Sequence, residues 1–299
     1  MDWITASLCS ALFLGVYDIF KKRSVNGNAV IPVLFVSTVT SAAVWAPAMV
    51  WSRWVGEGVE ESFVYVDSLA WRDHGLLFLK SLIVATSWVL SYFGLKHLPV
   101  SVASPIRATS PFWTMLGAIF LLGERPTLLQ GIGICVTVAF FFLFSIAGRK
   151  EGIRFHRNRW VLLIALATLV GAASSLYDKF LLGNLGYRPA TVQAWFSVYL
   201  VVALLPLMIG WWLKWWPRGT FQWRWTIPAI GLTLLLADFV YFTALADEDS
   251  LISVVSSVRR ANVLVVFLAG YVLFKERNYR AKTPCLVGIL LGIGLILLG

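Results

Sequence analysis

Long apolar runs constrain this 299-residue chain more than any other feature of its sequence. Ten of them are long enough, or nearly long enough, to cross a bilayer at about 20 residues each. They cover roughly residues 3–22, 30–51, 76–95, 99–122, 128–147, 160–182, 191–213, 226–246, 251–274 and 283–299. The runs are continuous and lack the period of two that membrane β-strands require. We therefore expect an all-α integral membrane protein with ten transmembrane helices.

Composition supports a membrane protein and argues against a nucleic-acid-binding one. Only 13% of the residues are charged and 59% are hydrophobic, whereas a soluble domain carries about twice that charged fraction. The formal net charge of +10 would suggest nucleic acid in a soluble protein, but here Lys and Arg lie mostly in short loops between apolar runs. The three cysteines lie in apolar segments without metal-ligand spacing, and no cofactor is expected.

The chain repeats itself with an offset of 152 residues. Residues 101–107 read SVASPIR and residues 253–259 read SVVSSVR, and the pair Glu124-Arg125 returns as Glu276-Arg277. The pair Tyr17-Asp18 also returns, at a slightly larger offset, as Tyr177-Asp178. We predict two domains of five helices each, residues 1–150 and 151–299. An odd number of helices puts the second repeat into the membrane in the opposite direction, which gives inverted repeats.

The basic residues of the loops predict the orientation in the membrane. Loops after the odd-numbered helices hold 16 Lys and Arg, and those after the even-numbered helices hold four. The positive-inside rule places the odd-numbered loops in the cytoplasm and both termini outside. The expected location is the inner, or cytoplasmic, membrane.

Charged residues within the apolar runs are the candidates for a functional site. Such residues are costly in a bilayer, so they face a bundle interior or a water-filled cavity and pair with one another. At 1.5 Å of rise per residue, Asp18 lies at the depth of Arg107 near one face, and Asp178 lies at the depth of Arg259 near the other. The substrate-binding candidates are Arg107, Arg259 and Arg260, and the gating or coupling candidates are Asp18, Asp178, Asp238, Tyr17 and Tyr177.

Other interpretations of these residues stay open. Asp18 can pair with Lys22 one helical turn further on, and Lys179 can extend to the interface. Arg107 and Arg259 can be buried charges that only hold helices together, and one of Arg259 and Arg260 can serve structure by pairing with Asp238. Three aromatic residues, Trp88, Tyr92 and Tyr241, are candidates for the cavity wall, although packing is the alternative for each. Gly288 and Gly292 permit a close helix contact, either internal or in a homodimer.

Several short motifs follow one another along both halves of the chain. They are Tyr92-Phe-Gly-Leu-Lys, Pro99-Val-Ser-Val-Ala-Ser, Pro111, Gly123-Glu124-Arg125, Gly131 and Gly133 in the first half, and Tyr241-Phe-Thr-Ala-Leu, Glu276-Arg277 and Gly288 in the second. In these features the chain resembles the EamA-type branch of the drug/metabolite transporter superfamily. The resemblance implies a basket of ten helices around a central cavity. It also implies transport of small organic solutes by alternating access.

These observations together predict a secondary transporter of a small anionic or zwitterionic organic metabolite, either proton-coupled or an exchanger. The main alternative is an exporter of amphipathic cations or drugs, in which the acidic residues face the cavity. The sequence has no G-x-x-x-x-G-K-[ST] phosphate loop, so ATP-driven pumping by this chain is not expected. An intramembrane enzyme and a structural scaffold are the remaining alternatives.

Overall fold

The computed structural model describes residues 2–54, 62–97, 106–107, 109–146, 158–215, 219–266, 268 and 279–299, without the side chains of residues 92, 95, 96, 144–146 and 279–282. Every regular element in these ranges is helical. The α-helices are α1 (Trp3–Val25), α2 (Val30–Trp54), α3 (Trp71–His97), α5 (Ser110–Leu122), α6 (Leu128–Ile146), α7 (Arg159–Lys179), α8 (Pro189–Trp212), α9 (Thr226–Leu245), α10 (Ile252–Val258) and α12 (Tyr279–Leu298). A π-helix, η2 (Phe180–Asn184), extends α7, and a 3-10 helix, η3 (Arg259–Ala261), extends α10.

The all-helical membrane architecture is confirmed. Within the described residues, six helical segments are long and apolar enough to span a membrane: Trp3–Val25, Val30–Trp54, Trp71–Ser91, Arg159–Asn184, Pro189–Trp212 and Thr226–Leu245. Three further apolar helices are shorter, namely Ser110–Leu122, Leu128–Leu143 and Thr283–Leu298. The arrangement of ten membrane-spanning helices as inverted repeats stays a prediction.

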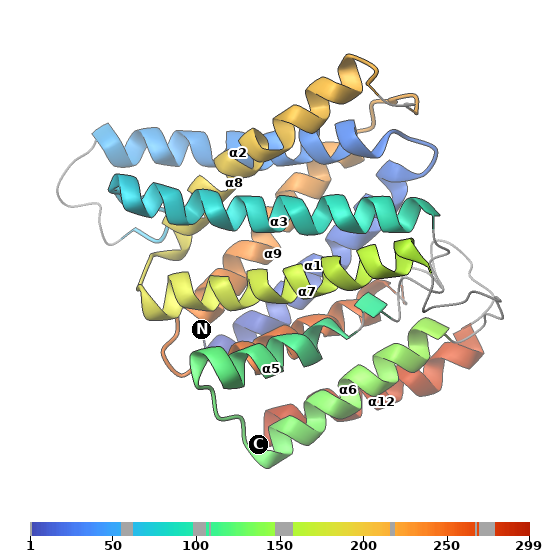
Figure 1. Cartoon of the computed structure of the whole chain (residues 1–299). Coiled ribbons are helices and arrows are strands. Elements are labelled where there is room, and N and C mark those ends of the chain that lie inside the picture. Colours follow the sequence, from blue (N-terminus) through green and yellow to red (C-terminus); the bar gives the residue numbers. More distant parts are fainter. Residues whose placement is uncertain are drawn as a thin grey trace.

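The helices pair mainly across the two halves of the chain. α1 packs along α9, and α7, which is the counterpart of α1, packs along α3, which is the counterpart of α9. In the same way α2 contacts α9 while α8 contacts α3. The counterparts α2 and α8 contact each other, and so do α6 and α12, which lie side by side at one edge of the bundle (Figure 1). If the two halves correspond as predicted, these contacts are reciprocal between them.

Small and hydroxylic residues allow these close contacts. A Cβ atom at Gly231 of α9 would overlap the backbone oxygen of Ser37 on α2, so only glycine fits there. Serine hydroxyls bridge neighbouring helices: Ser10 Oγ donates to the Ala237 carbonyl at 2.7 Å, and Ser87 Oγ donates to the Ala167 carbonyl at 2.9 Å. Without a hydrophobic driving force between helices in lipid, such packing and hydrogen bonding hold the bundle together.

The glycines of α12 make an internal contact. Added Cβ atoms at Gly288 and Gly292 would collide with the Phe140 ring and with Thr137 of α6, respectively. The small-residue face therefore packs α12 against α6. This surface of α12 therefore gives no support to a homodimer, which stays a prediction.

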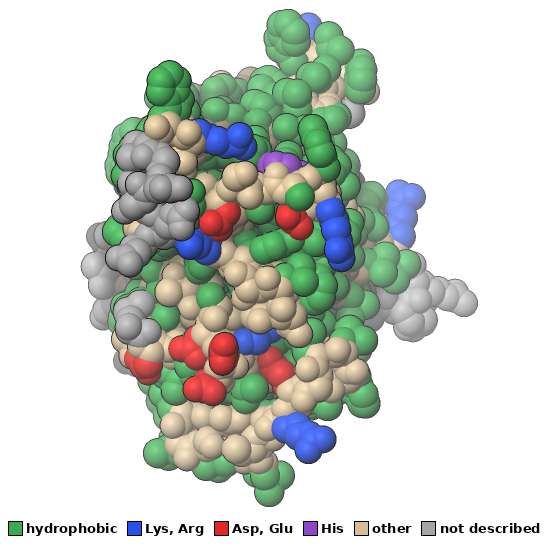
Figure 2. Space-filling model, turned by 90° about the vertical axis from the view of Figure 1, so that its left-hand side faces the viewer, with side chains coloured by type: hydrophobic (Ala, Val, Ile, Leu, Met, Phe, Trp, Pro, Cys, Tyr) green, Lys and Arg blue, Asp and Glu red, His purple; other side chains and the backbone are tan. Residues whose placement is uncertain are grey.

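Both termini lie at the same end of the helices, at the left of Figure 1. Figure 2 looks onto that end, where acidic side chains gather near its middle. The described segments there carry Asp67, Asp73, Asp247, Glu248 and Asp249. At the opposite end, the last turn of α1 carries Lys22 and Arg23. We call the first end the terminal end and the other the basic end.

Candidate functional site

A cavity of about 350 Å³ lies between helices of both halves, within the usual size range of small-molecule sites. Its walls come from α1, α2, α3, α7, α8, α9, α10 and η3. Nine of the predicted site residues line it: Tyr17, Asp18, Trp88, Arg107, Asp178, Asp238, Tyr241, Arg259 and Arg260. Its charged side chains comprise five cations and three anions: Lys21, Lys80, Arg107, Arg259 and Arg260 against Asp18, Asp178 and Asp238. The cavity therefore has an excess of positive charge.

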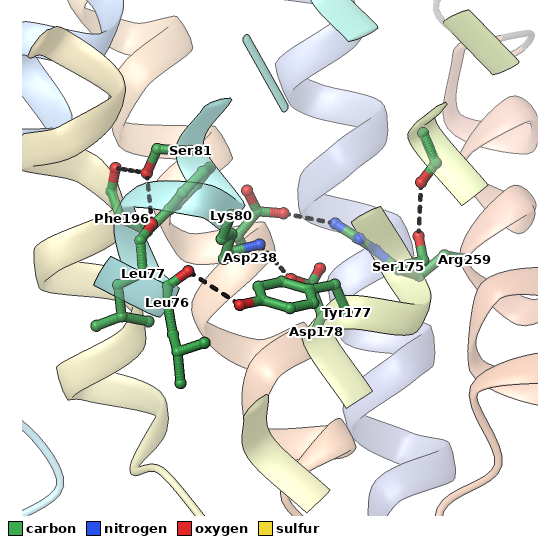
Figure 3. A network of polar contacts seen from close by, with 11 residues as sticks. Leu76, Leu77, Lys80, Ser81, Ser175, Tyr177, Asp178, Phe196, Asp238 and Arg259 are labelled. Atoms are coloured by element: carbon green, nitrogen blue, oxygen red, sulfur yellow. Dashed lines mark hydrogen bonds and ion pairs between the residues drawn. The ribbon is translucent and has the colours of Figure 1, made fainter. Parts of the chain in front are cut away.

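Among the described residues, the most deeply buried ion pair joins Lys80 of α3 to Asp178 of α7 (Figure 3). The side chains are 2% and 7% exposed, so water screens neither charge. The Lys80 ammonium also lies 4.4 Å from the ring centroid of Phe196 and 4.9 Å from that of Phe242. Both aromatic faces stabilise the cation in a place where water is excluded.

A second ion pair joins Asp238 of α9 to Arg259 at the end of α10. Arg259 Nη2 donates to Asp238 Oδ1 at 2.8 Å, and each side chain is 16% exposed. The Arg259 guanidinium also lies over the Tyr241 ring, 4.0 Å from its centroid. Arg259 is thus held on both sides by α9, which favours a structural contribution from this residue.

Two other guanidinium groups of the cavity stand apart from these pairs. In the described part of the chain, neither Arg107 nor Arg260 takes part in an ion pair. The charges of Arg107 and Arg260 repel each other, and the charge of Asp18 attracts Arg260. The buried Nε of Arg260 has no hydrogen-bond partner among the described atoms. An anionic group of a ligand would satisfy these donors.

The structure corrects the predicted charge pairs. Asp178 was expected beside Arg259 but pairs with Lys80, and Arg259 pairs with Asp238. Asp18 was expected beside Arg107, yet its carboxylate accepts a hydrogen bond of 2.8 Å from the Asn262 amide. Residues at a similar depth in the membrane need not pair, because the rotation of each helix about its own axis determines which neighbouring side chain a residue faces.

Lys80 lines the cavity, although the sequence analysis does not single it out. The predicted apolar run begins at residue 76, which places Lys80 close to the start of the run. In the structure α3 begins five residues earlier, at Trp71, so Lys80 lies inside the helix. Its neighbour Ser81 is fully buried, and two consecutive polar residues in an apolar run were the available signal.

The remaining predicted residues lie elsewhere. Tyr177 does not line the cavity, because its hydroxyl donates to the Leu76 carbonyl of α3 at 3.2 Å. The side chain of Tyr92 falls outside the described atoms. Lys179 does not extend to the interface: it is buried and donates to the Leu245 and Asp247 carbonyls at 3.3 and 3.1 Å. A cation there complements the partial negative charge at the end of α9.

Glu124 binds the start of α10, at the same end of the molecule at which Lys179 binds the end of α9. Gly123, with φ of +69°, ends α5 in the left-handed conformation that favours glycine, and the chain then turns Glu124 toward α10. The carboxylate accepts hydrogen bonds from the backbone amides of Ile252 and Ser253 at 2.6 and 3.2 Å. Glu124 and Lys179 therefore hold the connection between α9 and α10 from two sides.

The two ends of the cavity differ. Toward the terminal end it is bounded by a buried apolar cluster that includes Tyr241, Phe242, Leu245 and Ile252. Toward the basic end the cavity extends to Val25 and Val30, which are the last residue of α1 and the first residue of α2. The Lys80–Asp178 pair contacts this cluster through Phe242, at the end of the cavity that the cluster bounds.

This arrangement defines a multi-pass helical membrane protein with a charged cavity between its helices, which is the usual build of a solute transporter. Residues 1–146, just under half of the chain, match the model of the EamA-like transporter family. This match points to a transporter and not to an enzyme. The described residues contain no group of three or more His, Cys, Asp or Glu side chains placed to hold a metal ion.

Two similar proteins complement this match. A curated relative from Streptantibioticus cattleyicolor, named "Probable terminal-alkyne amino-acid exporter", is 30% identical over 121 residues. That match covers 40% of this chain and 40% of the relative, so it spans less than half of either protein. A crystal structure that is 14% identical covers 99% of this chain and 96% of its own, with a TM-score of 0.73. It shows that the fold extends over almost the whole chain.

Proposed function

We propose that the protein is a secondary active transporter of a small anionic or zwitterionic organic metabolite in the cytoplasmic membrane. The observation that carries this proposal is the cavity between the halves, with its excess of positive charge. Two of its guanidinium groups, on Arg107 and Arg260, are not engaged in ion pairs within the described residues. Guanidinium groups bind carboxylate and phosphate oxygens through paired hydrogen bonds.

A zwitterion fits the charges better than a simple anion. Asp18 lies in the same cavity as Arg107 and Arg260 and attracts Arg260 electrostatically. A solute with a carboxylate and an ammonium group can therefore satisfy charges of both signs. The name of the relative, an amino-acid exporter, agrees with this substrate class.

We further propose that the Lys80–Asp178 pair holds the terminal end closed. It joins α3 to α7 beside the apolar cluster that bounds the cavity at that end. A proton on Asp178, or a substrate charge that competes for either partner, would weaken the pair and favour opening at that end. Such competition couples the conformation to the ligand, because only a group that interacts differently with the two states can shift them.

The test is exchange in proteoliposomes. Vesicles loaded with unlabelled L-alanine should accumulate external radiolabelled L-alanine, and a chemically unchanged product would exclude an enzyme. Arg260→Ala should reduce exchange at least tenfold, Arg260→Lys should restore part of it, and Arg53→Ala should leave it unchanged. Arg53 provides a matched charge change because it is exposed in the last turn of α2 and does not line the cavity.

The charge selectivity of transport separates the main candidates. Tetraphenylphosphonium, an amphipathic cation, should neither exchange nor compete with alanine. If this cation is transported and the zwitterion is not, the protein is an exporter of amphipathic cations. In that case Arg107 and Arg260 would only hold helices together, as Arg259 does through Asp238 and Tyr241.

A further inference from the structure

An apolar chamber adjoins the charged cavity. It has a volume of about 70 Å³ and lies between α2, α3 and α8. Its lining residues are all apolar: Ile31, Leu34, Trp88, Val89, Phe93, Leu204 and Leu207. Leu34 and Trp88 line both spaces, so the chamber and the cavity share a wall.

We propose that this chamber receives the apolar side chain of the transported solute while the charged cavity holds its polar end. This inference rests on the proposed function and refines its substrate class to zwitterions that carry an unbranched aliphatic chain. The shared wall is the argument for this occupant. A solute whose charged groups bind the arginines and aspartates of the cavity lies next to Trp88. The apolar chamber begins beside the same residue, where it can take the side chain of the solute.

The volume of the chamber limits the length of the aliphatic side chain that it can hold. A single water-sized group needs about 10–15 Å³ of such space. The chamber therefore accommodates about five to seven carbon atoms, so the six-carbon side chain of L-2-aminooctanoate fits within it and an eight-carbon side chain does not. An apolar lining cannot satisfy a second charged group, so polar side chains of similar length are excluded.

The experiment measures binding of a homologous series to the purified full-length protein in nanodiscs by isothermal titration calorimetry. The probes are L-alanine, L-norvaline, L-norleucine, L-2-aminooctanoate and L-2-aminodecanoate. Each methylene group that enters the chamber should lower Kd about fourfold. The gain should stop once the chamber is full, so that L-2-aminodecanoate binds about as tightly as L-2-aminooctanoate.

Filling the chamber should remove the dependence on chain length. Leu207→Trp on α8 and Val89→Phe on α3 should flatten the series while the Kd of L-alanine stays unchanged, which also shows that each variant is folded. Leu205→Trp is the matched control, because Leu205 lies on the same helix, is 41% exposed and does not line the chamber. This control should keep the wild-type series.

Other outcomes distinguish this inference from the proposed function. If L-alanine binds but the wild-type series is flat, the chamber does not take the side chain, and the proposed function stands. If no member binds, the proposed function fails and this inference falls with it. If Leu207→Trp expels a phospholipid seen by native mass spectrometry and leaves the series unchanged, the chamber holds a lipid chain and the inference is overturned.

Discussion

The Lys80–Asp178 pair predicts a specific pattern of stabilities. Replacing Lys80 with methionine keeps most of the side-chain volume but leaves the Asp178 carboxylate, 7% exposed, without its partner. Breaking a buried ion pair from one side costs about 3–5 kcal/mol, because the remaining charge is neither solvated nor paired. Loss of the contacts with Phe196 and Phe242 adds about 1 kcal/mol. We therefore expect Lys80→Met to lower the free energy of unfolding by about 4–6 kcal/mol.

Neutralising both partners should recover most of that loss. In Lys80→Met/Asp178→Asn no charge remains buried, and only the cation–ring contacts and some packing are missing. The double variant should be more stable than either single variant, with a coupling energy of about 3 kcal/mol. The control Lys21→Met removes the same charge from the basic end of the cavity, where the side chain is partly exposed, and should cost less than about 1 kcal/mol.

The assay is reversible unfolding of the four proteins of the cycle in mixed detergent micelles, followed by circular dichroism. If the losses of the two single variants simply add in the double variant, the two residues do not interact energetically. The pair would then not contribute to closure of the terminal end, and the reasoning from its burial would be refuted.

Four further predictions concern other parts of the molecule. Asp178→Asn should increase labelling of a single cysteine at Ser175, in an otherwise cysteine-free chain, by an impermeant reagent applied at the terminal end; unchanged labelling would contradict the gating proposal. Burial and the hydrogen bond to Asp73 raise the pKa of Tyr187 to about 12, whereas the unfolded phenol ionises near 10. The stability linked to this phenol is present below pH 10 and lost as the pH rises to about 12, so Tyr187→Phe should flatten stability curves across that window. Glu124→Ala should lower the free energy of unfolding by about 2–3 kcal/mol, because the amides at the start of α10 lose a charged acceptor; chemical denaturation measures this loss. A C-terminal reporter that is active only in the cytoplasm should stay silent, and a bright signal would reverse the predicted orientation.

The helices were predictable because their signal is local. A run of about 20 apolar residues is a property of consecutive positions, and each described helix falls on a predicted run. The gathering of charges in one cavity followed from the cost of exposing them to lipid. Nine of the eleven predicted site residues line that cavity.

The partners of those charges were not predictable from depth alone. Asp178 and Lys179 are consecutive, yet a rotation of about 100° sends the first into the cavity and the second to the end of α9. Which cation meets Asp178 depends on how α3 is rotated against α7, and no pattern within one helix encodes that angle. Lys80 was overlooked for a simpler reason: the polar first turn of α3, from Trp71 to Gly75, reads like a loop.

The reciprocal packing of the helices has a consequence for how the protein is made. α1 finds its main partner in α9, which begins at Thr226, about 200 residues later in the chain. At about 5–20 residues per second of synthesis, α1 waits roughly 10–40 seconds in the membrane before that partner exists. During this interval its buried serines and Asp18 have no native partner from the second half. We therefore expect the newly made first half to bind membrane-insertion factors that cover polar groups in lipid. Crosslinking of arrested nascent chains should detect contacts of α1 with such factors until α9 has been synthesised.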